Sequence, residues 1–447
     1  MLRTVFALST APARSALAVI RISGPLASSA LSLAPGPAIS PFKATFRPLI
    51  DPTSHLVLDH AVVLFFPKPR SFTLEDTVEL QVHGSLAVIR KLLSLLGKIQ
   101  GFHPAEPGEF TKQALLNGRF DALQVEALSD LIRAETDWQL NQAVSHLEGA
   151  AGKVYARWRE QLLHALAMCE AWIDFEEPGE DVHLEAKIFT EIKAILQEVE
   201  QHLAAAYLSR PLAVALLGPP NSGKSSLLNA LAREEIAIVA ATPGTTRDIN
   251  RATLDLSGLP VTFYDTAGLR KTQDPVELEG QRRALQTQKA ALIRLCVLDR
   301  TECRVDGEAY DWPEGLVMEK PDLVLINKID LHLGNRAKYV NFNGEKVDCM
   351  HISCKTKEGL TPLLAYISTR ISQDRPPEGT VLISRERHKV HIDALKVRLQ
   401  SALSDNISFD MKSEELREAV KCIGRVAGRV DAEEVLDRVF HEFCIGK

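Results

Sequence analysis

One stretch decides the fold of the middle of this chain: Gly218-Pro-Pro-Asn-Ser-Gly-Lys-Ser-Ser226. The apolar run before it, residues 212–217, is typical of a buried strand, and residues 227–231 after it are typical of a starting helix. A strand, a Gly-x4-Gly-Lys-Ser loop and a helix form a phosphate cradle, because glycine lets backbone N–H groups curl around an anion. We expect Lys224 to reach the terminal phosphates and Ser225 to hold magnesium. A glycine-rich turn without a ligand is the alternative, and the flanking strand and helix argue against it.

The bulk composition is that of an ordinary soluble protein of several domains. The chain has 447 residues, of which 45% are hydrophobic and 25% charged. This length predicts roughly two to four domains. The net charge of −6 argues against a general nucleic-acid or membrane coat. Apolar runs such as residues 61–66 are too short to cross a bilayer, so no membrane span is expected. Seven scattered cysteines, an odd number, favour reduced thiols in an intracellular compartment.

Two local signals suggest other interpretations. The stretch Cys349-Met-His-Ile-Ser-Cys354 has metal-ligand residue types, but no second ligand pair follows at finger-like spacing, so no metal role is expected there. The first fifty residues contain no acidic side chain, as in an organelle transit peptide. Residues 16–22 alternate like a domain strand, however, which predicts a folded domain at this end and not a removable leader.

The N-terminal part, residues 1–117, mixes short strand-like runs with Pro and Gly turns. Residues 16–22, 61–66 and 77–82 are the expected strands, and residues 86–96 are the expected helix. This mixture predicts a compact α+β domain.

A helical domain follows, and an α/β domain interrupts it. Residues 114–134 and 138–172 carry apolar side chains at three- and four-residue spacing, which predicts long helices. From residue 211 to 372 strands alternate with helices, the pattern of a parallel-type sheet with helices on both faces. Helical sequence then resumes after a Pro- and Gly-containing linker. We therefore expect a multidomain α/β and α+β chain, with a helical domain at 118–210 and 373–447 and a P-loop domain at 211–372 inserted into it.

Four further motifs follow the phosphate loop at suitable distances. Gly244-Thr-Thr-Arg-Asp248 offers a threonine hydroxyl to magnesium or the γ-phosphate. Asp265-Thr-Ala-Gly268 offers a carboxylate to magnesium through water and a backbone N–H to the γ-phosphate. Asn327-Lys-Ile-Asp330 places an aspartate that accepts both guanine N1–H and N2–H, a pattern that adenine cannot offer. Ser353-Cys-Lys355 closes over the guanine oxygen with a backbone N–H. Each motif is weak alone, but in this order they specify a Ras-like GTPase.

The residue after Gly268 departs from the Ras pattern. Ras-like enzymes have a glutamine there that orients the attacking water, whereas this chain has Leu269, which cannot. Another group must position the water, and another positive charge must stabilise the leaving phosphates. Glu277 and Glu279 are candidates for the first task, and a solvated helix face is the alternative interpretation of both.

Taken together, these features resemble the MnmE (TrmE) family of tRNA-modification GTPases over essentially the whole chain. The N-terminal part matches in Val19-Ile-Arg-Ile-Ser-Gly24, Ser71-Phe-Thr-x-Glu-Asp76, Pro107-Gly-Glu-Phe110 and Leu116-Asn-Gly-Arg-Phe-Asp121. The GTPase part matches in Pro220-Asn-x-Gly-Lys-Ser-Ser226 and Pro243-Gly-Thr-Thr-Arg-Asp248. The last residues, Phe443-Cys-Ile-Gly-Lys447, match the family's C-terminal signature, and a frayed terminus is the alternative for them.

The motifs and the resemblance together imply a set of GTP contacts. They are Asn221, Ser222, Gly223, Lys224, Ser225, Ser226, Ala240, Ala241, Thr242, Pro243, Gly244, Thr245, Thr246, Asp265, Thr266, Ala267, Gly268, Asn327, Lys328, Asp330, Ser353, Cys354 and Lys355. Magnesium is expected on Ser225 and Thr246, with Asp265 behind it.

The resemblance also supplies the missing positive charge. Members of the family use a potassium ion where other GTPases use an arginine finger, and a fixed monovalent cation stabilises the same transition-state charge. The implied potassium ligands are the Asn221 side chain, the Ala240 and Thr242 carbonyls, and Thr245. The water-positioning glutamate aligns with Glu277 and not with Glu279, on a segment that in the family reorganises when two GTPase domains dimerise.

The N-terminal domain of the family resembles folate-binding one-carbon enzymes and drives constitutive homodimerisation. The implied site for a tetrahydrofolate derivative (5-formyl- or 5,10-methylene-tetrahydrofolate) consists of Arg21, Glu79, Arg119 and Lys447. Glu79 can pair with pterin N–H donors, and the cations can meet the folate carboxylates. An ordinary surface-charge role is the alternative for each, and relatives often have lysine in place of Arg119. Cys444 is either a functional thiol or a small buried hydrophobe.

The function so implied is modification at C5 of the wobble uridine of certain tRNAs, of the 5-carboxymethylaminomethyl or 5-taurinomethyl type. It requires an MnmG-type partner that carries FAD and uses NADH, and folate supplies the one-carbon bridge. GTP hydrolysis drives conformational cycling of the complex and not the carbon chemistry. The charge distribution reveals no tRNA path, so the nucleic-acid expectation rests on the resemblance.

Three local stretches look more like the mitochondrial branch of the family than the bacterial one. They are Gly218-Pro-Pro220, Ala241-Thr-Pro-Gly-Thr-Thr246 and Pro275-Val-Glu277. They predict the mitochondrial matrix, with the bacterial cytoplasm as the alternative.

Two other functions stay open. A ribosome-assembly, RNA-binding GTPase of the Era or Der kind ends in a KH-type domain with a Gly-x-x-Gly loop. The nearest stretch here, Gly424-Arg-Val-Ala-Gly428, has three intervening residues and a helical context. The third hypothesis is a folate-dependent one-carbon enzyme with a regulatory GTPase, which analysis of wobble nucleosides separates from the first.

Overall fold

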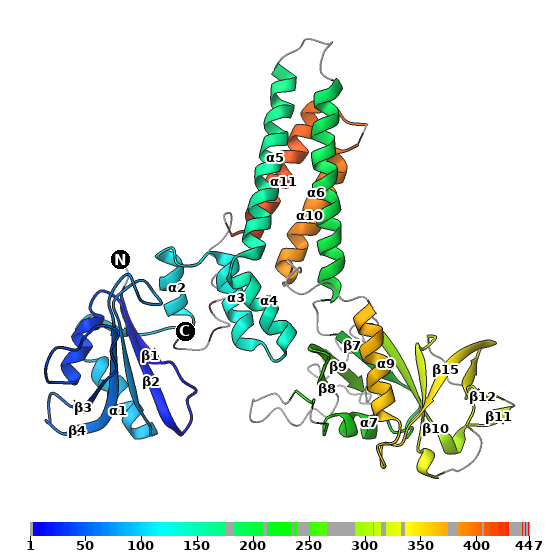
Figure 1. Ribbon diagram of the computed structural model, residues 1–447, viewed down its shortest axis with the longest axis horizontal. Coiled ribbons are helices and arrows are strands. Elements are labelled where there is room, and N and C mark those ends of the chain that lie inside the picture. The colour runs from blue at the N-terminus through cyan, green and yellow to red at the C-terminus, as the bar shows by residue number, and fades with distance from the viewer. Residues whose placement is uncertain are drawn as a thin grey trace, which may run out of the picture. The chain divides into compact units, whose positions relative to one another are not determined.

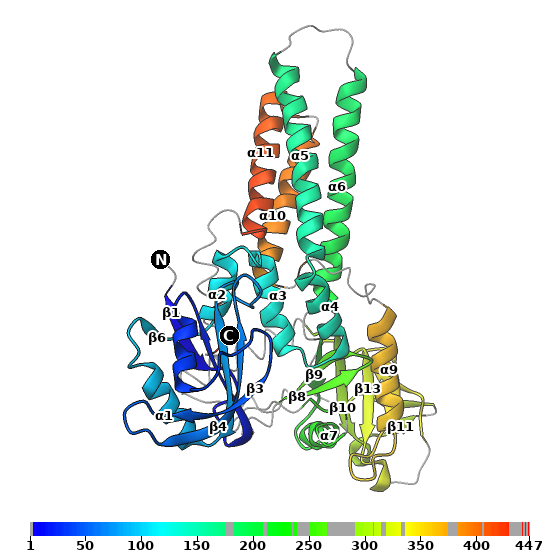
Figure 2. The same ribbon diagram turned by 60° about the vertical axis from the view of Figure 1, so that its left-hand side comes forward.

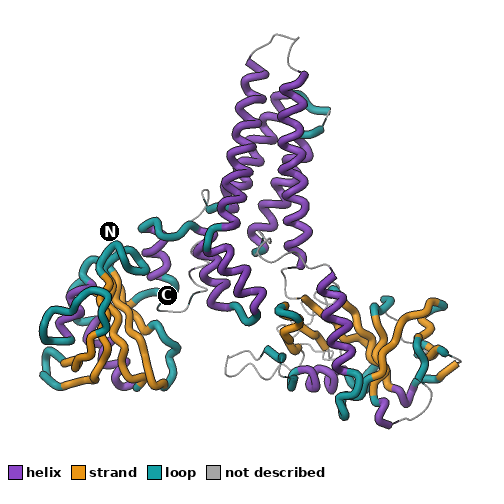
Figure 3. The backbone as a smooth tube through the Cα atoms, viewed as in Figure 1, coloured by secondary structure: helices purple, strands orange, loops and turns teal. Residues whose placement is uncertain are grey.

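The structure is a computed structural model, and it divides into two compact units. It describes residues 3–174, 182–208, 212–234, 236–238, 251–265, 291–306, 308–313, 319–331, 336–373, 383, 385–404, 406–428, 440, 443 and 446. Unit 1 comprises Met1–Arg133, Ala143–Gln197 and Val390–Lys447, and unit 2 comprises Ala134–Gln142 and Glu198–Lys389. Strands form the N-terminal part of unit 1 and much of unit 2, and the rest of unit 1 is helical (Figure 3).

Six strands of the described N-terminal part form one sheet in the order β3-β4-β5-β2-β1-β6. They are β1 (Thr4–Leu8), β2 (Ser15–Ser23), β3 (Thr45–Ile50), β4 (Val57–Phe66), β5 (Thr77–Gly84) and β6 (Phe102–Pro104). Neighbouring strands run antiparallel except β1 and β6, which run parallel. The strands predicted at residues 16–22, 61–66 and 77–82 are confirmed as β2, β4 and β5.

One face of this sheet holds the N-terminal core, because alternate residues of a strand point to the same side. Ile20, Val63 and Leu80 are fully buried there. Helix α1 (Leu86–Leu96), at its predicted position, and the 3-10 helix η1 (Ala27–Leu33) contribute side chains to the same core. Arg21 and Glu79 alternate with these core residues and lie opposite each other in the β2–β5 register, so they face the other side of the sheet.

The remaining described part of unit 1 is helical. Its helices, three of which lie partly in unit 2, are α2 (Glu109–Leu116), α3 (Ala122–Arg133), α4 (Asp137–Leu147), α5 (Ala150–Asp174), α6 (Val182–Leu208), α10 (Glu386–Ala402) and α11 (Phe409–Val426). The unit 1 parts of α5, α6, α10 and α11 run side by side (Figures 1 and 2). An ion pair between Arg417 and Glu170 links α11 to α5. None of the described helices combines the length and apolar character needed to cross a membrane.

The long helices predicted from apolar spacing are not continuous, because each is interrupted at a glycine. Gly118 (φ +78°) lies between α2 and α3, and Gly149 (φ +85°) lies between α4 and α5. Both have left-handed backbone angles, which glycine adopts without a Cβ penalty and which commonly end a helix. Residues 114–134 therefore belong to two helices, and residues 138–172 belong to two others.

The described sheet of unit 2 has the strand order β11-β12-β14-β15-β13-β10-β7-β9-β8. The strands are β7 (Leu212–Leu217), β8 (Arg251–Leu256), β9 (Leu259–Asp265), β10 (Ile293–Asp299), β11 (Val305–Asp306), β12 (Ala309–Asp311), β13 (Leu323–Asn327), β14 (Tyr339–Phe342) and β15 (Glu345–His351). The central strands β15-β13-β10-β7-β9 run parallel, whereas β8 pairs antiparallel with β9, and β14 with β15. The parallel centre confirms the predicted α/β class.

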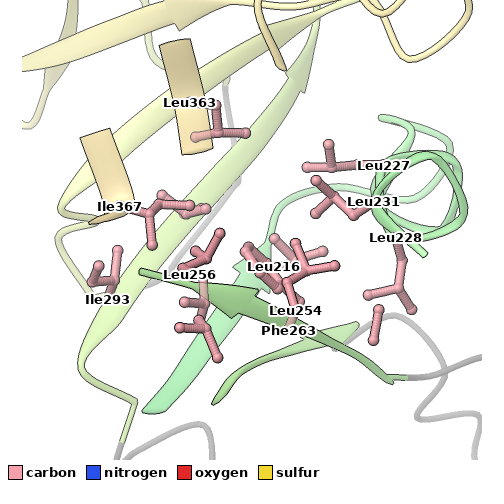
Figure 4. Packing of buried hydrophobic residues seen from close by; sticks show 14 of the residues in the cluster. Leu216, Leu227, Leu228, Leu231, Leu254, Leu256, Phe263, Ile293, Leu363 and Ile367 are labelled. Atoms are coloured by element: carbon pink, nitrogen blue, oxygen red, sulfur yellow. The ribbon is translucent and has the colours of Figure 1, made fainter. Parts of the chain in front are cut away.

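The central strand β10 is buried on both faces, as parallel strands usually are. Leu295 faces a core that it shares with Leu231 of α7 (Lys224–Leu231) and Ile367 of α9 (Leu360–Gln373), which Figure 4 shows from close by. The next residue, Cys296, faces a second core with Val324. This packing fixes the carboxyl ends of the parallel strands at one edge of the sheet, where ligands bind in open α/β folds.

Candidate functional site

The phosphate loop has the predicted strand–loop–helix form. β7 ends at Leu217, and α7 begins at Lys224 with Gly223 as its N-cap. Gly218 has φ +128° and Gly223 has φ +101°. A Cβ at Gly218 would lie 2.2 Å from the Val297 carbonyl oxygen, so the loop passes too close to β10 for any larger residue. The loop therefore presents the N-terminus of α7, with its partial positive charge, to an anion.

The Lys224 ammonium lies inside this loop. Its Nζ donates hydrogen bonds to the carbonyl oxygens of Gly218 at 2.8 Å and Pro219 at 2.6 Å. Burial lowers the pKa of Lys224, and the negative charge of Asp265 acts against that effect. Phosphate oxygens are charged and so are stronger acceptors than carbonyls. The ammonium is therefore placed to transfer its hydrogen bonds to a bound nucleotide.

Ser225 and Asp265 meet at the predicted magnesium position. Ser225 lies in the first turn of α7, and Asp265 is the last residue of β9. Leu216 of β7 lies opposite Asp265 in the parallel register, so the two strands end side by side. Ser225 Oγ donates to Asp265 Oδ2 at 2.5 Å. A hydroxyl and a carboxylate are the oxygen ligands that Mg²⁺ prefers, so this pair fits the ion.

The predicted guanine-recognition residues converge beside the phosphate loop. Asn327 ends β13, and its Nδ2 donates to the Ser222 carbonyl at 3.0 Å. Its Oδ1 accepts the Cys354 backbone N–H at 3.3 Å. Ser353 Oγ donates to Asp330 Oδ1 at 2.6 Å, which orients that carboxylate. Asn327 thus joins the phosphate loop to the loop at residues 353–355.

Lys328 contacts Asp299, which was not predicted as a site residue. Its Nζ donates to the Asn221 carbonyl at 3.0 Å and to Asp299 Oδ2 at 2.5 Å. Burial alone would raise the pKa of Asp299, but hydrogen bonds from Lys328 and Thr301 outweigh it and hold that pKa below its ordinary value. The available signal was the position of Asp299 at the end of a buried strand, opposite Asn327 in the β10–β13 register.

Several predicted site residues lie outside the described part of the chain. They are Ala240, Ala241, Thr242, Pro243, Gly244, Thr245, Thr246, Thr266, Ala267, Gly268, Glu277, Cys444 and Lys447. Their roles stay predictions. Among the described residues, Ser226 and Lys355 are exposed, and the predicted potassium ligand Asn221 is exposed with φ +64°.

Two of the predicted folate-binding residues, Arg21 and Arg119, lie beside one aromatic ring of the N-terminal domain, and Arg21 pairs with a third, Glu79. Arg21 Nε and Nη2 both lie 2.9 Å from Glu79 Oε1. The guanidinium carbons of Arg21 and Arg119 lie 5.8 Å and 5.7 Å from the centre of the Phe72 ring. Arg119 Nη1 also donates to the Ser71 carbonyl at 2.9 Å. Phe72 was not predicted as a site residue, although it lies within the matched motif at residues 71–76.

The described residues of the C-terminal signature are packed and not frayed. Ser9 Oγ donates to the Gly446 carbonyl at 2.9 Å. Phe440 and Phe443 are buried in a cluster with Val125 of α3. The end of the chain is therefore anchored on the N-terminal domain and α3, within unit 1.

The cysteine and histidine residues at 349–354 have a structural role. Burial raises the pKa of the Cys349 thiol to about 12 and that of Cys354 to about 11, so both are protonated at neutral pH. His351 Nε2 lies 2.9 Å from the Tyr310 hydroxyl. Among the residues that the structure describes, no group of three or more His, Cys, Asp or Glu side chains is placed to hold a metal ion.

Comparison with known proteins finds full-length relatives. Residues 4–119 match the family model described as GTP-binding protein TrmE N-terminus, and residues 123–444 match the MnmE helical domain. A protein of Parvibaculum lavamentivorans named tRNA modification GTPase MnmE is 40% identical over 456 residues, with 100% of both chains covered. Proteins of the same name from Paramagnetospirillum magneticum (40% over 456 residues) and Methylobacterium sp. (41% over 460 residues) also match over 100% of both chains.

These relatives do not support the predicted mitochondrial branch. The proteins compared are bacterial. Of the three stretches behind that prediction, Gly218-Pro-Pro220 lies in the phosphate loop, and the other two lie outside the described residues. Three such short stretches were not enough to identify the branch.

The geometry and the comparisons agree on the activity. The phosphate loop, the Ser225–Asp265 pair and the guanine-recognition residues form one continuous site at the carboxyl edge of the sheet. The two family models together span residues 4–444. The chain is therefore a GTP hydrolase that belongs to the MnmE (TrmE) family of tRNA modification GTPases.

Proposed function

We propose that this protein is a potassium-activated GTPase that modifies C5 of the wobble uridine of certain tRNAs. It acts with a flavoprotein partner of the MnmG type, which carries FAD, and its one-carbon donor is a tetrahydrofolate derivative. The compartment is the bacterial cytoplasm, so the modification is of the 5-carboxymethylaminomethyl type. The full-length similarity to proteins named tRNA modification GTPase supports the tRNA part. The observation that carries the potassium part is the conformation of Asn221.

Asn221 lies in the phosphate loop with its backbone fixed and its side chain exposed. Its φ is +64°, and its carbonyl oxygen accepts a hydrogen bond from Lys328. Its side-chain amide makes no hydrogen bond to the described part of the chain, so the amide oxygen is available to a cation beside the phosphates. Leu269 replaces the glutamine of Ras-like enzymes. Charge stabilisation must then come from another source, and a monovalent cation on Asn221 fits.

The site divides its tasks among named residues. Asn221, Ala240, Thr242 and Thr245 hold potassium, and Ser225 and Thr246 hold magnesium. Bound there, the two ions supply positive charge to the phosphates as the bond to the γ-phosphate breaks. Lys224 moves its hydrogen bonds from the loop carbonyls to phosphate oxygens. Glu277 positions the attacking water.

The N-terminal site fits a folate. Arg21 occupies only Oε1 of Glu79, and the second carboxylate oxygen makes no hydrogen bond to the described residues. That oxygen can accept pterin N–H donors. The side chains of Arg21 and Glu79 are only 22% and 17% exposed, so the pair lies in a partly closed environment where charged hydrogen bonds are stronger. Lys447 adds a further cation to this site.

The N-terminal domain is also the proposed homodimer contact. Phe46 on the edge strand β3 is 69% exposed, and Leu17 on β2 is 50% exposed. An edge strand has unpaired backbone groups and can pair with another chain. A second copy of this chain is the proposed partner there.

Mass spectrometry of tRNA nucleosides tests the tRNA part. Cells that lack the protein should lose the C5-modified wobble uridine and accumulate its unmodified precursor, and a plasmid copy should restore it. Unchanged wobble uridines would rule out the proposed function.

Steady-state GTP turnover tests the potassium part. Turnover should be at least tenfold faster in potassium than in sodium at equal ionic strength. Glu277→Gln should abolish turnover in potassium while GTP still binds. Equal rates in the two salts would rule out the potassium assignment but would not affect the tRNA proposal.

A further inference from the structure

Two hydrogen bonds join the loop that follows β13 to the phosphate loop, and they involve two successive residues of each loop. Asn327 donates to the Ser222 carbonyl, and Lys328 donates to the Asn221 carbonyl. Lys328 (φ +63°) and Asn221 (φ +64°) both have left-handed backbone angles, which are unfavourable for residues other than glycine. Surrounding contacts must therefore hold both residues in place.

Asp299 holds the side chain of Lys328 in place. Its Oδ2 accepts from Lys328 Nζ at 2.5 Å. Its Oδ1 accepts from the backbone N–H and the hydroxyl of Thr301, at 2.9 Å and 2.8 Å. Because both carboxylate oxygens are engaged, the carboxylate cannot rotate without losing a charged hydrogen bond. The ammonium of Lys328 is therefore directed by a fixed acceptor at the end of β10.

The burial of this ion pair sets it apart from the other pairs in the described part of unit 2. The Asp299 side chain is 7% exposed and that of Lys328 is 34% exposed. The Lys320–Glu345 pair, by comparison, is 52% and 65% exposed. Exposed pairs contribute little to stability or position, whereas a buried carboxylate with a single cationic partner depends strongly on that partner.

We propose that Asp299 is a positioning residue for guanine-nucleotide binding. By holding the Lys328 ammonium on the Asn221 carbonyl, it keeps Asn327 and Asp330 in the geometry that recognises guanine beside the phosphate loop. Asp299 need not touch the nucleotide. The inference depends on GTP binding alone and not on the proposed roles of potassium, folate or tRNA.

Nucleotide binding to the intact protein tests this role. The variant Asp299→Asn keeps the size of the side chain and an oxygen for Thr301, but it removes the charge that attracts Lys328. We expect the Kd for GDP and for GTP to rise about tenfold each, the size expected for loss of one charged hydrogen bond. The preference for GDP over IDP, which lacks the N2 amino group seen by Asp330, should fall about threefold, as expected for a smaller loss in the Asp330 contact. All titrations use sodium buffer, so potassium activation plays no part in the result.

Two matched variants separate positioning from a purely structural role. Glu345→Gln removes the acid of an exposed ion pair in the same unit and should leave both Kd values unchanged. The double variant Asp299→Asn/Lys328→Met removes both charges, so no buried charge is left unpaired and the melting temperature should recover. Its affinity should stay as low as that of Lys328→Met alone, because the two residues act through one contact.

The outcomes are distinct. Recovery of GDP affinity together with stability in the double variant would show that Asp299 acts only on folding, and would overturn the proposal. Unchanged Kd values in Asp299→Asn, with weaker binding in Lys328→Met, would do so as well, because Lys328 would then be held without Asp299.

Discussion

Ser225 Oγ lies 2.5 Å from Asp265 Oδ2, so the phosphate loop and the end of β9 are joined by one hydrogen bond between residues 40 positions apart. Asp265 is only 7% exposed. Ser225 would hold magnesium here directly and Asp265 through water, and the bound ion would supply positive charge to the phosphates. The fold thus brings both oxygens to one place.

Removal of either oxygen should therefore abolish magnesium-dependent turnover. For Ser225→Ala and Asp265→Asn we expect GTP turnover at saturating nucleotide to fall by a factor of about 100 or more, because charge stabilisation by the ion is a main part of phosphoryl transfer. Turnover measured over a magnesium titration checks this. Ser372→Ala on α9, whose hydroxyl bonds to the Ser368 carbonyl, is the control and should behave as wild type. A normal magnesium response in Ser225→Ala would contradict the assignment.

Gly223→Ala should be far more damaging than the same change at Gly344. Both glycines have left-handed angles, φ +101° and φ +89°. An added Cβ lies 2.0 Å from Asn327 Nδ2 at Gly223, whereas nothing lies within 4 Å at Gly344. Backbone strain alone should cost about 1–2 kcal/mol at Gly344. Gly223→Ala adds a clash that displaces Asn327 from the Ser222 carbonyl.

Urea unfolding and GDP titration measure the difference. We expect Gly344→Ala to bind GDP with wild-type affinity and to lose only a little stability. Gly223→Ala should lose measurable GDP binding. Equal behaviour of the two variants would mean that the close approach of Asn327 is unimportant.

The local parts of the site could be predicted from the sequence, and the long-range parts could not. The spacing of Gly218, Gly223, Lys224 and Ser225 specifies a strand, a loop and a helix, because it constrains neighbouring residues. The contact of Lys328 with Asp299 depends on which strands become neighbours, over a separation of 29 positions. No short pattern encodes that adjacency.

The ends of the helices could not be predicted from the sequence either. Apolar spacing predicted helices over residues 114–134 and 138–172, and the helical character was correct. Periodicity is insensitive to a break of a few residues, so the stops at Gly118 and Gly149 were missed. A glycine within a helical pattern is tolerated in many helices, and only the structure shows its left-handed angle.

The stability of unit 2 should fall in mild acid partly because of His351. Burial, followed by the positive charges of Arg336 and Arg300, lowers the pKa of His351 below its ordinary value. The unfolded chain then binds the proton more readily than the folded one. The neutral histidine contributes its full stability above about pH 6.5, and that contribution is lost as pH falls through the folded pKa.

Urea unfolding at a series of pH values checks the direction of this pH dependence. His351→Gln cannot titrate but can still bond to the Tyr310 hydroxyl, so its stability should fall less between about pH 6.5 and 5 than that of wild type. The exposed His103 gives a control, and His103→Gln should keep the wild-type slope. A wild-type slope in His351→Gln would show that other groups cause the acid sensitivity.

Trp138 links the first turn of α4 to the core of the GTPase unit. The residue is 5% exposed and belongs to the same buried cluster as Leu216 and Phe263. Its backbone nitrogen and Cβ lie 3.8 Å from the point that a Cβ on Gly258 would occupy, at the turn between β8 and β9. Its indole Nε1 makes no hydrogen bond within the described residues. The side chain therefore acts through packing alone.

Two substitutions measure how much packing this position contributes. Trp138→Ala leaves a large cavity and should reduce the free energy of unfolding by about 3–5 kcal/mol, whereas Trp138→Phe keeps a ring and should cost about 1 kcal/mol. Urea unfolding followed through a fluorescent guanine nucleotide reports on the unit that carries the site. The exposed neighbour Leu140 (42% exposed) supplies the control, because Leu140→Ala should change stability by less than about 0.5 kcal/mol. If Trp138→Ala and Leu140→Ala had equal effects on stability, the first turn of α4 would be shown not to contribute to the GTPase core.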